Sequence, residues 1–193
     1  SAAYFLARGG RKVALLEKGR IGAEQSSRNW GWCRQQNRDA RELPLATQSL
    51  ALWEEIQSEL GEDLGFRRCG LLYLSDDEAE IAGWAKWRDF AAGEGVVTHM
   101  LSAAEATGRG SATGKPWKGG IFSPSDGIAD PARAAPMIAR GVIQHGGTVH
   151  QFCAARGLET EAGRVSAVVT AHGTIRTRQV VPAGGAWASS FCR

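Results

Sequence analysis

The sequence lacks any long apolar run, and no stretch approaches the roughly 20 apolar residues that a membrane-spanning helix requires. It also lacks a basic block, because its 23 Lys and Arg are interspersed with 20 Asp and Glu, for a formal net charge of +3. We therefore expect no transmembrane segment and no nucleic-acid partner. The four cysteines and four histidines do not have the spacing of metal ligands, so we expect no metal site and free thiols in a reducing compartment.

A glycine-rich phosphate-binding turn is also missing, although the elements that normally follow such a turn are present. Ser1–Arg8 is rich in helix formers and is closed by Gly9-Gly10, and the apolar run 13–16 then leads into Glu17. Helix, tight turn, strand and acid form the second half of a βαβ dinucleotide-binding unit. The glycine turn of that unit precedes the acid by about 20 residues. We therefore expect it just upstream of Ser1, and we interpret the chain as one that starts inside the helix of this unit.

Glu17 is the first residue with a predicted binding role. A carboxylate at the end of the second strand can accept hydrogen bonds from the ribose hydroxyls of an adenosine, and it would repel a 2′-phosphate. This favours FAD or NAD over NADP. The alternative is a glutamate that ends a strand and faces solvent.

The segment 26–36 is a predicted loop dense in hydroxyls, amides and glycine, and it carries Trp30 and Trp32. Small polar residues beside glycine allow backbone N–H groups to approach a pyrophosphate, and the indoles offer flat apolar surface for an aromatic ring. The alternative is a surface loop held by two partly buried tryptophans.

The remainder of the chain predicts alternating helices and strands. A capping box at Ser102 and the pair Asp130-Pro131 mark two helix starts. No motif is found in 107–118. Helices are expected over 39–60, 76–92 and from 130 to about 145. Strands are expected over 66–75, 96–101, 148–150, 153–160, 164–170 and 174–176, and a strand followed by a turn is expected over 119–127.

A final segment, 179–189, predicts a buried strand that leads through small residues into a helix start. Backbone can approach phosphate closely at such a place. Pro182 lacks the N–H that a strand residue donates, which leaves the pairing of this strand open. The alternative is a plain strand-to-helix turn.

Three segments together resemble the FAD-dependent D-amino-acid oxidase/dehydrogenase family, which includes glycine and sarcosine oxidases and some bacterial L-amino-acid oxidases. They are Glu17-Lys18-Gly19, the run Ser26-Ser27-Arg28-Asn29-Trp30-Gly31, and Val180-Val181-Pro182-Ala183-Gly184-Gly185-Ala186-Trp187. Pro182 departs from the family pattern, in which a residue with a free N–H is usual. The resemblance also implies that the chain is a fragment truncated at both its N- and C-terminal ends.

The resemblance implies FAD as the cofactor and assigns roles to the matching residues. It places Glu17 on the ribose, Ser26 and Ser27 along the pyrophosphate, and Asn29–Gly31 near the isoalloxazine. We expect Trp32 and Arg34 to face the flavin or the substrate. We assign no catalytic residue. The implied cofactor-binding set is Glu17, Lys18, Ser26, Ser27, Arg28, Asn29, Trp30, Gly31, Ala155 (at the adenine), Ala183, Gly184, Gly185 and Trp187.

The expected fold class is α/β, an incomplete FAD-binding Rossmann-like βαβ fold with part of an inserted α+β substrate domain. We expect residues 1–65 to form the first part of the FAD-binding domain, 66–124 the first part of the substrate domain, and 125–193 the second part of the FAD-binding domain.

The implied reaction is oxidative deamination of an amino acid. Hydride passes from Cα to flavin N5, and the products are a 2-oxo acid and ammonia. The expected partner is a small amino-acid substrate, and the oligomeric state is left open. The expected location is cytoplasmic, or peripheral to the inner membrane if a quinone accepts the electrons. The alternatives are another FAD oxidoreductase of this fold, resembling glycerol-3-phosphate dehydrogenase, or an inactive fragment that binds no cofactor.

Overall fold

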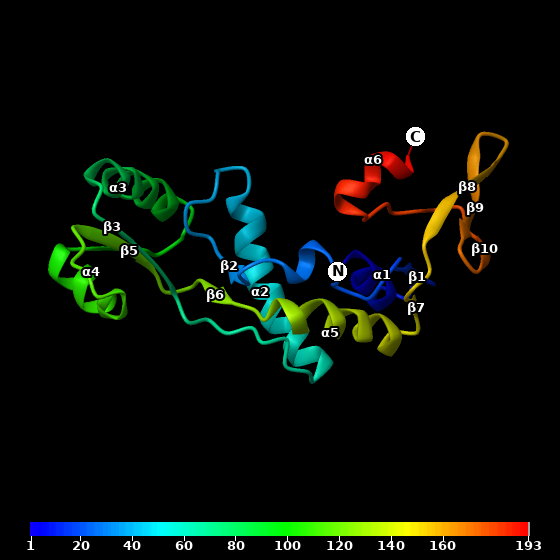
Figure 1. Cartoon of the computed structure of the whole chain (residues 1–193), viewed down its shortest axis with the longest axis horizontal. Helices are drawn as coiled ribbons and strands as arrows, with labels where there is room; N and C mark the ends of the chain where they lie inside the picture. Colours follow the sequence, from blue (N-terminus) through cyan, green and yellow to red (C-terminus); the bar gives the residue numbers. More distant parts are fainter. Residues whose placement is uncertain (193) are drawn as a thin grey trace. The chain divides into compact units, whose positions relative to one another are not determined.

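The computed structural model describes residues 1–192 and divides into two compact units (Figure 1). Unit one contains residues 1–27 together with the chain from Ala135 onward, and unit two is Arg28–Ala134. The later boundary falls inside helix α5 (Pro131–Gln144). Each unit is described by itself.

Unit one contains a parallel pair of strands next to helix α1 (Ala2–Arg8). Strand β1 (Ala14–Leu16) pairs with β7 (Thr148–His150), with Ala14 opposite Thr148. The fully buried ring of Tyr4 on α1 meets His145 edge-on, with centroids 5.5 Å apart. Helix, turn and parallel strand therefore occur in the expected order.

The second sheet of unit one is an antiparallel meander with the strand order β10-β9-β8. It comprises β8 (Ala155–Glu161), β9 (Arg164–Thr170) and β10 (Gly173–Arg176). Ala162 and Gly163 both have positive φ, 51° and 74°, as a type I′ hairpin turn requires. After the meander come the short helices η3 (Gly185–Trp187) and α6 (Ala188–Phe191), and near the start of the chain lies η1 (Gln25–Ser27).

The core of unit two is built on helix α2 (Leu43–Leu60), which has Pro44 in its first turn and ends at Gly61 in the left-handed conformation. Leu50 on this helix packs against Phe66 and Ala129. The two-residue strands β2 (Trp32–Cys33) and β6 (Gly127–Ile128) pair antiparallel beside this cluster.

A three-stranded antiparallel sheet forms the rest of unit two, in the order β3-β5-β4. The strands are β3 (Leu71–Ser75), β4 (His99–Leu101) and β5 (Gly119–Ser123). Helices α3 (Glu78–Gly93) and α4 (Ala103–Arg109) contact this sheet, and η2 (Ser111–Thr113) follows α4. Ile121 in the central strand is fully buried.

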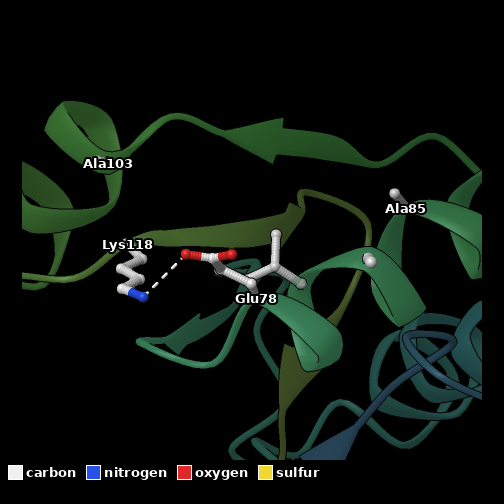
Figure 2. Close-up of a pocket in the computed structure, with 6 residues that line it drawn as sticks. Glu78, Ala85, Ala103 and Lys118 are labelled. Atoms are coloured by element: carbon white, nitrogen blue, oxygen red, sulfur yellow. Dashed lines mark hydrogen bonds and ion pairs between the residues drawn. The ribbon is translucent and has the colours of Figure 1, made fainter.

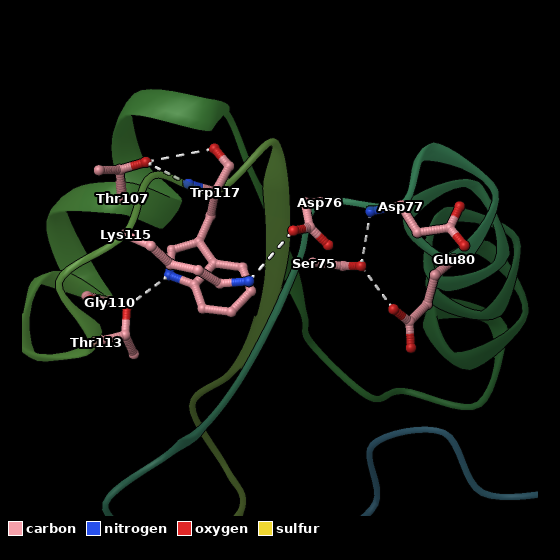
Figure 3. A network of polar contacts seen from close by, with 9 residues as sticks. All are labelled: Ser75, Asp76, Asp77, Glu80, Thr107, Gly110, Thr113, Lys115 and Trp117. Carbon is pink, nitrogen blue, oxygen red and sulfur yellow. Dashed lines mark hydrogen bonds and ion pairs between the residues drawn. The ribbon is translucent and has the colours of Figure 1, made fainter.

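Polar side chains fix the end of β3 to the start of α3 (Figure 3). The Ser75 hydroxyl donates to Glu80 Oε2 at 2.6 Å and accepts from the Asp77 N–H at 3.0 Å. The carboxylate of Asp77 caps α3 by accepting the Ala79 N–H. On the neighbouring segment, Lys115 reaches Asp76 Oδ2 at 3.2 Å.

The cap signals of the sequence are confirmed, while several predicted boundaries and one strand are wrong. Both bonds of the Ser102 capping box are present, and Asp130 Oδ1 accepts the Ala132 N–H at 2.8 Å. Strand β3 begins at Leu71 rather than Phe66, because Gly70 turns the chain with φ +75°. No strand forms over 179–182, where Val181 is 62% exposed and Pro182 has no N–H to donate. The stretch 107–118 includes the end of α4 and all of η2.

The buried carboxylate of Asp126 accepts hydrogen bonds from the backbone of the segment that follows β2. Asp126 is fully buried, and its Oδ1 and Oδ2 accept the backbone N–H groups of Gln35 at 2.8 Å and Gln36 at 3.0 Å. Burial raises the pKa of Asp126, and the two N–H donors and the charges of Arg34 and Arg68 oppose that rise. The residue therefore fixes the segment that carries Trp32 and Arg34.

We predict that Asp126→Ala destabilises the protein by about 3 kcal/mol, because two buried backbone donors lose their acceptor. Urea unfolding measures the change. The matched control is Asp76→Ala, which removes an exposed ion pair to Lys115 and should cost far less than Asp126→Ala. Equal costs for the two variants would contradict the role of Asp126.

We also predict a pH dependence of the stability difference between the wild type and Asp126→Asn. The folded pKa of Asp126 is raised, so its contribution to stability is fully present below the ordinary aspartate value and is lost as pH rises through the raised one. The advantage of the wild type should therefore be largest in acid and shrink towards neutral pH. Unfolding curves over a pH series measure it; a constant difference would show that the pKa is not shifted.

Candidate functional site

Glu17 lies at the carboxyl end of β1, and the backbone fixes its position. Its N–H donates to His150 O at 2.9 Å, and its carbonyl accepts the Cys153 N–H at 2.8 Å. The half-buried side chain turns back so that Oε1 accepts the Gly19 N–H at 2.7 Å. Oε2 has no hydrogen-bond partner within residues 1–192, which leaves a carboxylate oxygen available for a ligand hydroxyl.

Lys18 connects the segment after β1 with the C-terminal predicted segment through a cation–π contact with Trp187. Its Nζ lies 4.2 Å from the ring centroid of Trp187 and 3.5 Å from Glu24 Oε1. Trp187 is 61% exposed. A cation over an exposed indole contributes about 0.5–1 kcal/mol. The structure therefore brings the end of β1 and the end of η3 together within unit one.

The other predicted residues of unit one are exposed. Ser26 and Ser27 lie in η1, where the Ser27 hydroxyl donates to Glu24 O at 3.2 Å. Ala155 begins β8 opposite Thr170. Ala183 and Gly184 precede η3. Gly185 has φ +56°, and a Cβ placed there would meet nothing within 4 Å, so the backbone at this turn is open to close approach by another molecule.

Asn29 and Gly31 in unit two form a local turn in which Asn29 Oδ1 accepts the Gly31 N–H at 2.8 Å. Gly31 has φ +73°, its carbonyl accepts the Ala129 N–H at 2.8 Å, and a Cβ would lie 2.1 Å from Ala129 O. The close approach of Gly31 to Ala129 is therefore enough to require glycine at this position, whether or not a ligand binds nearby.

Trp30 and Trp32 border a shallow hollow of unit two together with Arg28 and Asn29. The indoles are 77% and 43% exposed, and they meet edge-on with centroids 5.2 Å apart. Arg34, half-buried two residues further along, donates to the backbone carbonyl of Gln36.

The structure thus forms two groups of predicted residues, one in each unit. Glu17, Lys18, Ser26, Ser27, Ala155, Ala183, Gly184, Gly185 and Trp187 belong to unit one, and Arg28, Asn29, Trp30, Gly31, Trp32 and Arg34 to unit two. Direct contacts join Lys18 to Trp187, Asn29 to Gly31 and Trp30 to Trp32. Ala155 pairs with Thr170, which is not one of the predicted residues.

Sequence reasoning missed Asp126 and Tyr73. Asp126 stands in the run Ser123-Pro124-Ser125-Asp126-Gly127, whose composition indicates only a turn. Tyr73 was assigned to a strand for its aromatic ring, and nothing in the sequence pairs it with Trp32. The tertiary structure places the two ring centroids 6.0 Å apart.

A second hollow of unit two is lined by residues of α3 and α4 (Figure 2) and contains no predicted site residue. Its apolar lining is Ile81, Ala82, Ala85 and Ala103, and Lys118 and Glu78, which also line it, form an ion pair of 2.9 Å. Over residues 1–192 there is no group of three His, Cys, Asp or Glu placed to hold a metal. Within the same range, no helix is long and apolar enough to cross a membrane.

The residues of unit one fit the cofactor that the resemblance implies. An available carboxylate oxygen at the end of a parallel strand suits a ribose hydroxyl. The open turn at Gly185 and the ammonium of Lys18 suit the negatively charged part of a dinucleotide. The donor and acceptor types therefore agree with FAD.

Comparison with known proteins tests the resemblance over the whole chain. The family described as FAD dependent oxidoreductase (DAO) matches residues 1–193. Glycine oxidase from Geobacillus kaustophilus is 28% identical over 195 residues, which cover 96% of this chain and 51% of that protein. Mitochondrial sarcosine dehydrogenase from Mus musculus is 28% identical over 145 residues, covering 72% of this chain and 16% of that protein.

Among solved structures, L-amino acid deaminase from Proteus myxofaciens, in complex with anthranilate, has a TM-score of 0.92 and 31% identity. The match covers 98% of this chain and 44% of that one. The chain thus spans about half or less of the length of these relatives. These matches confirm the expected α/β fold of FAD-dependent oxidoreductases. The chain belongs to the DAO family of FAD-dependent oxidoreductases.

Proposed function

We propose that the natural protein containing this chain oxidises an amino acid with FAD to an imino acid, which water hydrolyses to a 2-oxo acid and ammonia. The observation that carries the proposal is the Glu17 carboxylate, held at the end of a parallel strand with Oε2 available, in a chain of the DAO family. The names of similar proteins, an L-amino acid deaminase and a glycine oxidase, support the substrate class.

FAD, when bound, supplies a hydride acceptor at flavin N5 for the hydrogen on the substrate Cα. The residues of this chain bind and orient. We propose that Glu17 accepts the ribose hydroxyls and that Lys18, Ser26 and Ser27 face the pyrophosphate. The remaining assignments of unit one are Ala155 at the adenine and the turn of Ala183, Gly184, Gly185 and Trp187 as a second backbone approach.

For unit two, we propose that Arg28, Asn29, Trp30 and Gly31 border the isoalloxazine, while Trp32 and Arg34 face the substrate. Arg34 is suited to a carboxylate because a guanidinium can donate two parallel hydrogen bonds to it. The role of Gly31 in this set is to allow the turn to pack against Ala129, because a side chain at this position would clash with the Ala129 carbonyl oxygen.

We further propose a functional division of the chain. Residues 1–65 and 125–193 bind the dinucleotide, and residues 66–124 begin the part that covers the substrate. The antiparallel sheet β3-β5-β4 with its two helices supports the middle assignment, because it is separate from the parallel pair β1-β7. Four free cysteines are typical of a reducing compartment, and we propose a cytoplasmic location.

We predict that Glu17→Ala in the natural full-length protein weakens FAD binding by about 10- to 100-fold. A hydrogen bond to a charged group contributes roughly 1.5–3 kcal/mol, and the variant removes the acceptor. Titration of the FAD-free protein with FAD, followed by flavin fluorescence, measures the dissociation constant. Glu161→Gln, an exposed carboxylate of the same unit, is the control and should bind as the wild type does. An unchanged constant for Glu17→Ala would remove Glu17 from the ribose site.

We predict that the 193-residue chain alone binds FAD weakly and has no activity, whereas the full-length protein is yellow. The chain spans about half of its relatives or less, so many cofactor contacts come from the remainder. Visible spectra of both purified proteins provide the test, followed by addition of D- and L-amino acids. Bleaching of the flavin bands by one enantiomer is the expected result for the full-length protein. A stoichiometric flavin spectrum on the short chain would contradict the first half of this prediction.

A further inference from the structure

Four aromatic rings of unit two form a continuous series, here called the aromatic row: Trp30, Trp32, Tyr73 and Trp84. Successive ring centroids lie 5.2, 6.0 and 5.8 Å apart, with interplanar angles of 70°, 42° and 56°. These are the separations and tilted arrangements that aromatic pairs favour. The row is therefore a packed unit, although its members come from a loop, two different sheets and helix α3.

Exposure rises steadily along the row. Trp84 is only 6% exposed, Tyr73 is half-buried, Trp32 is 43% exposed and Trp30 is 77% exposed. The inner rings anchor the outer ones, and the outer end lines the hollow that also includes Arg28 and Asn29. A rigid aromatic surface that ends in a hollow is typical of a site for an apolar ligand group.

Charged side chains of both signs act on the middle of the row. Arg34 is half-buried and lies two residues after Trp32 on the same segment. Burial raises the pKa of Tyr73, the charge of Asp126 adds to that rise, and the charges of Arg34 and Arg38 oppose it. Arg38 pairs with Glu42 at 3.3 Å. Arg34 donates to the Gln36 carbonyl and forms no ion pair with a carboxylate in residues 1–192. An aromatic face and an available guanidinium together suit a ligand that has both a ring and a carboxylate.

We propose that the Trp32–Tyr73 part of the aromatic row selects amino acids with an aromatic side chain, and that Arg34 attracts their carboxylate. This inference rests on the proposed amino-acid oxidation and specifies its substrate class. A substrate ring that packs against Trp32 gains an aromatic contact and removes apolar surface from water. Glycine or alanine gains neither.

The test measures kcat/KM of the full-length, FAD-loaded protein for phenylalanine and alanine, each as the enantiomer that reduces the flavin. We expect phenylalanine to be preferred by at least about tenfold, from one aromatic contact with its buried area. Trp32→Leu should lose most of this preference, and Trp32→Phe, which retains a ring, should keep it. Trp117→Leu is the matched control, because the Trp117 indole donates to Thr113 and is not a member of the row, so the preference should be unchanged.

A binding measurement gives a second readout that needs no turnover. Calorimetric titration with benzoate and with propionate compares an aromatic and an aliphatic carboxylate. Trp32→Leu should weaken benzoate about tenfold and leave propionate unchanged, whereas Arg34→Leu should weaken both. Thermal melting and the flavin spectrum verify that each variant is folded, which is expected for Trp32 because its ring is partly exposed.

The outcomes separate this inference from the proposed function. Flavin reduction with a preference for glycine or alanine, unaffected by Trp32→Leu, would overturn the aromatic specificity and leave amino-acid oxidation standing. Equal weakening of benzoate and propionate by Trp32→Leu would also overturn it. No reduction by any amino acid would remove both proposals together.

Discussion

The bidentate acceptance of two backbone N–H groups by the buried Asp126 carboxylate is the interaction on which unit two depends. It fixes Gln35 and Gln36 against the start of β6, and thereby fixes the segment that begins with β2. Without this acceptor, two buried donors would be unpaired, each at a cost of about 1–3 kcal/mol. The positions of Trp32 and Arg34 follow from this constraint, because they lie on the same short segment.

Unit one relies on a different constraint, the parallel pairing of β1 with β7. This pairing sets the direction in which Glu17 leaves the sheet, and the following turn closes on its Oε1 through the Gly19 N–H. Lys18 then points towards Trp187. A short parallel pair thus positions an acid and a base next to each other at the carboxyl end of its strands, the edge at which α/β folds bind nucleotides.

Local signals predicted most elements and both helix caps, because a cap depends on residues within one turn. Ser102 with Glu105, and Asp130 with Pro131, are such cases. The strand expected over 179–182 is absent, since apolar residues form a strand only where a neighbouring strand can bond to them, and the sequence does not show the neighbour. Gly31 was predicted for approach to a flavin, and its packing against Ala129, distant in sequence, became visible only in the fold.

The sequence by itself determined the family, through Glu17-Lys18-Gly19, the Ser26–Gly31 run and the Ala183–Trp187 turn, because a cofactor constrains short contiguous segments. It also determined the order of helices and strands, through apolar periodicity. Three features are visible only in the tertiary structure. They are the hydrogen bonds that Asp126 accepts from the backbone, the contact between Lys18 and Trp187, and the aromatic row from Trp30 to Trp84. Each of these joins residues far apart in the chain, and such pairs are selected by packing and burial, which have no local signature.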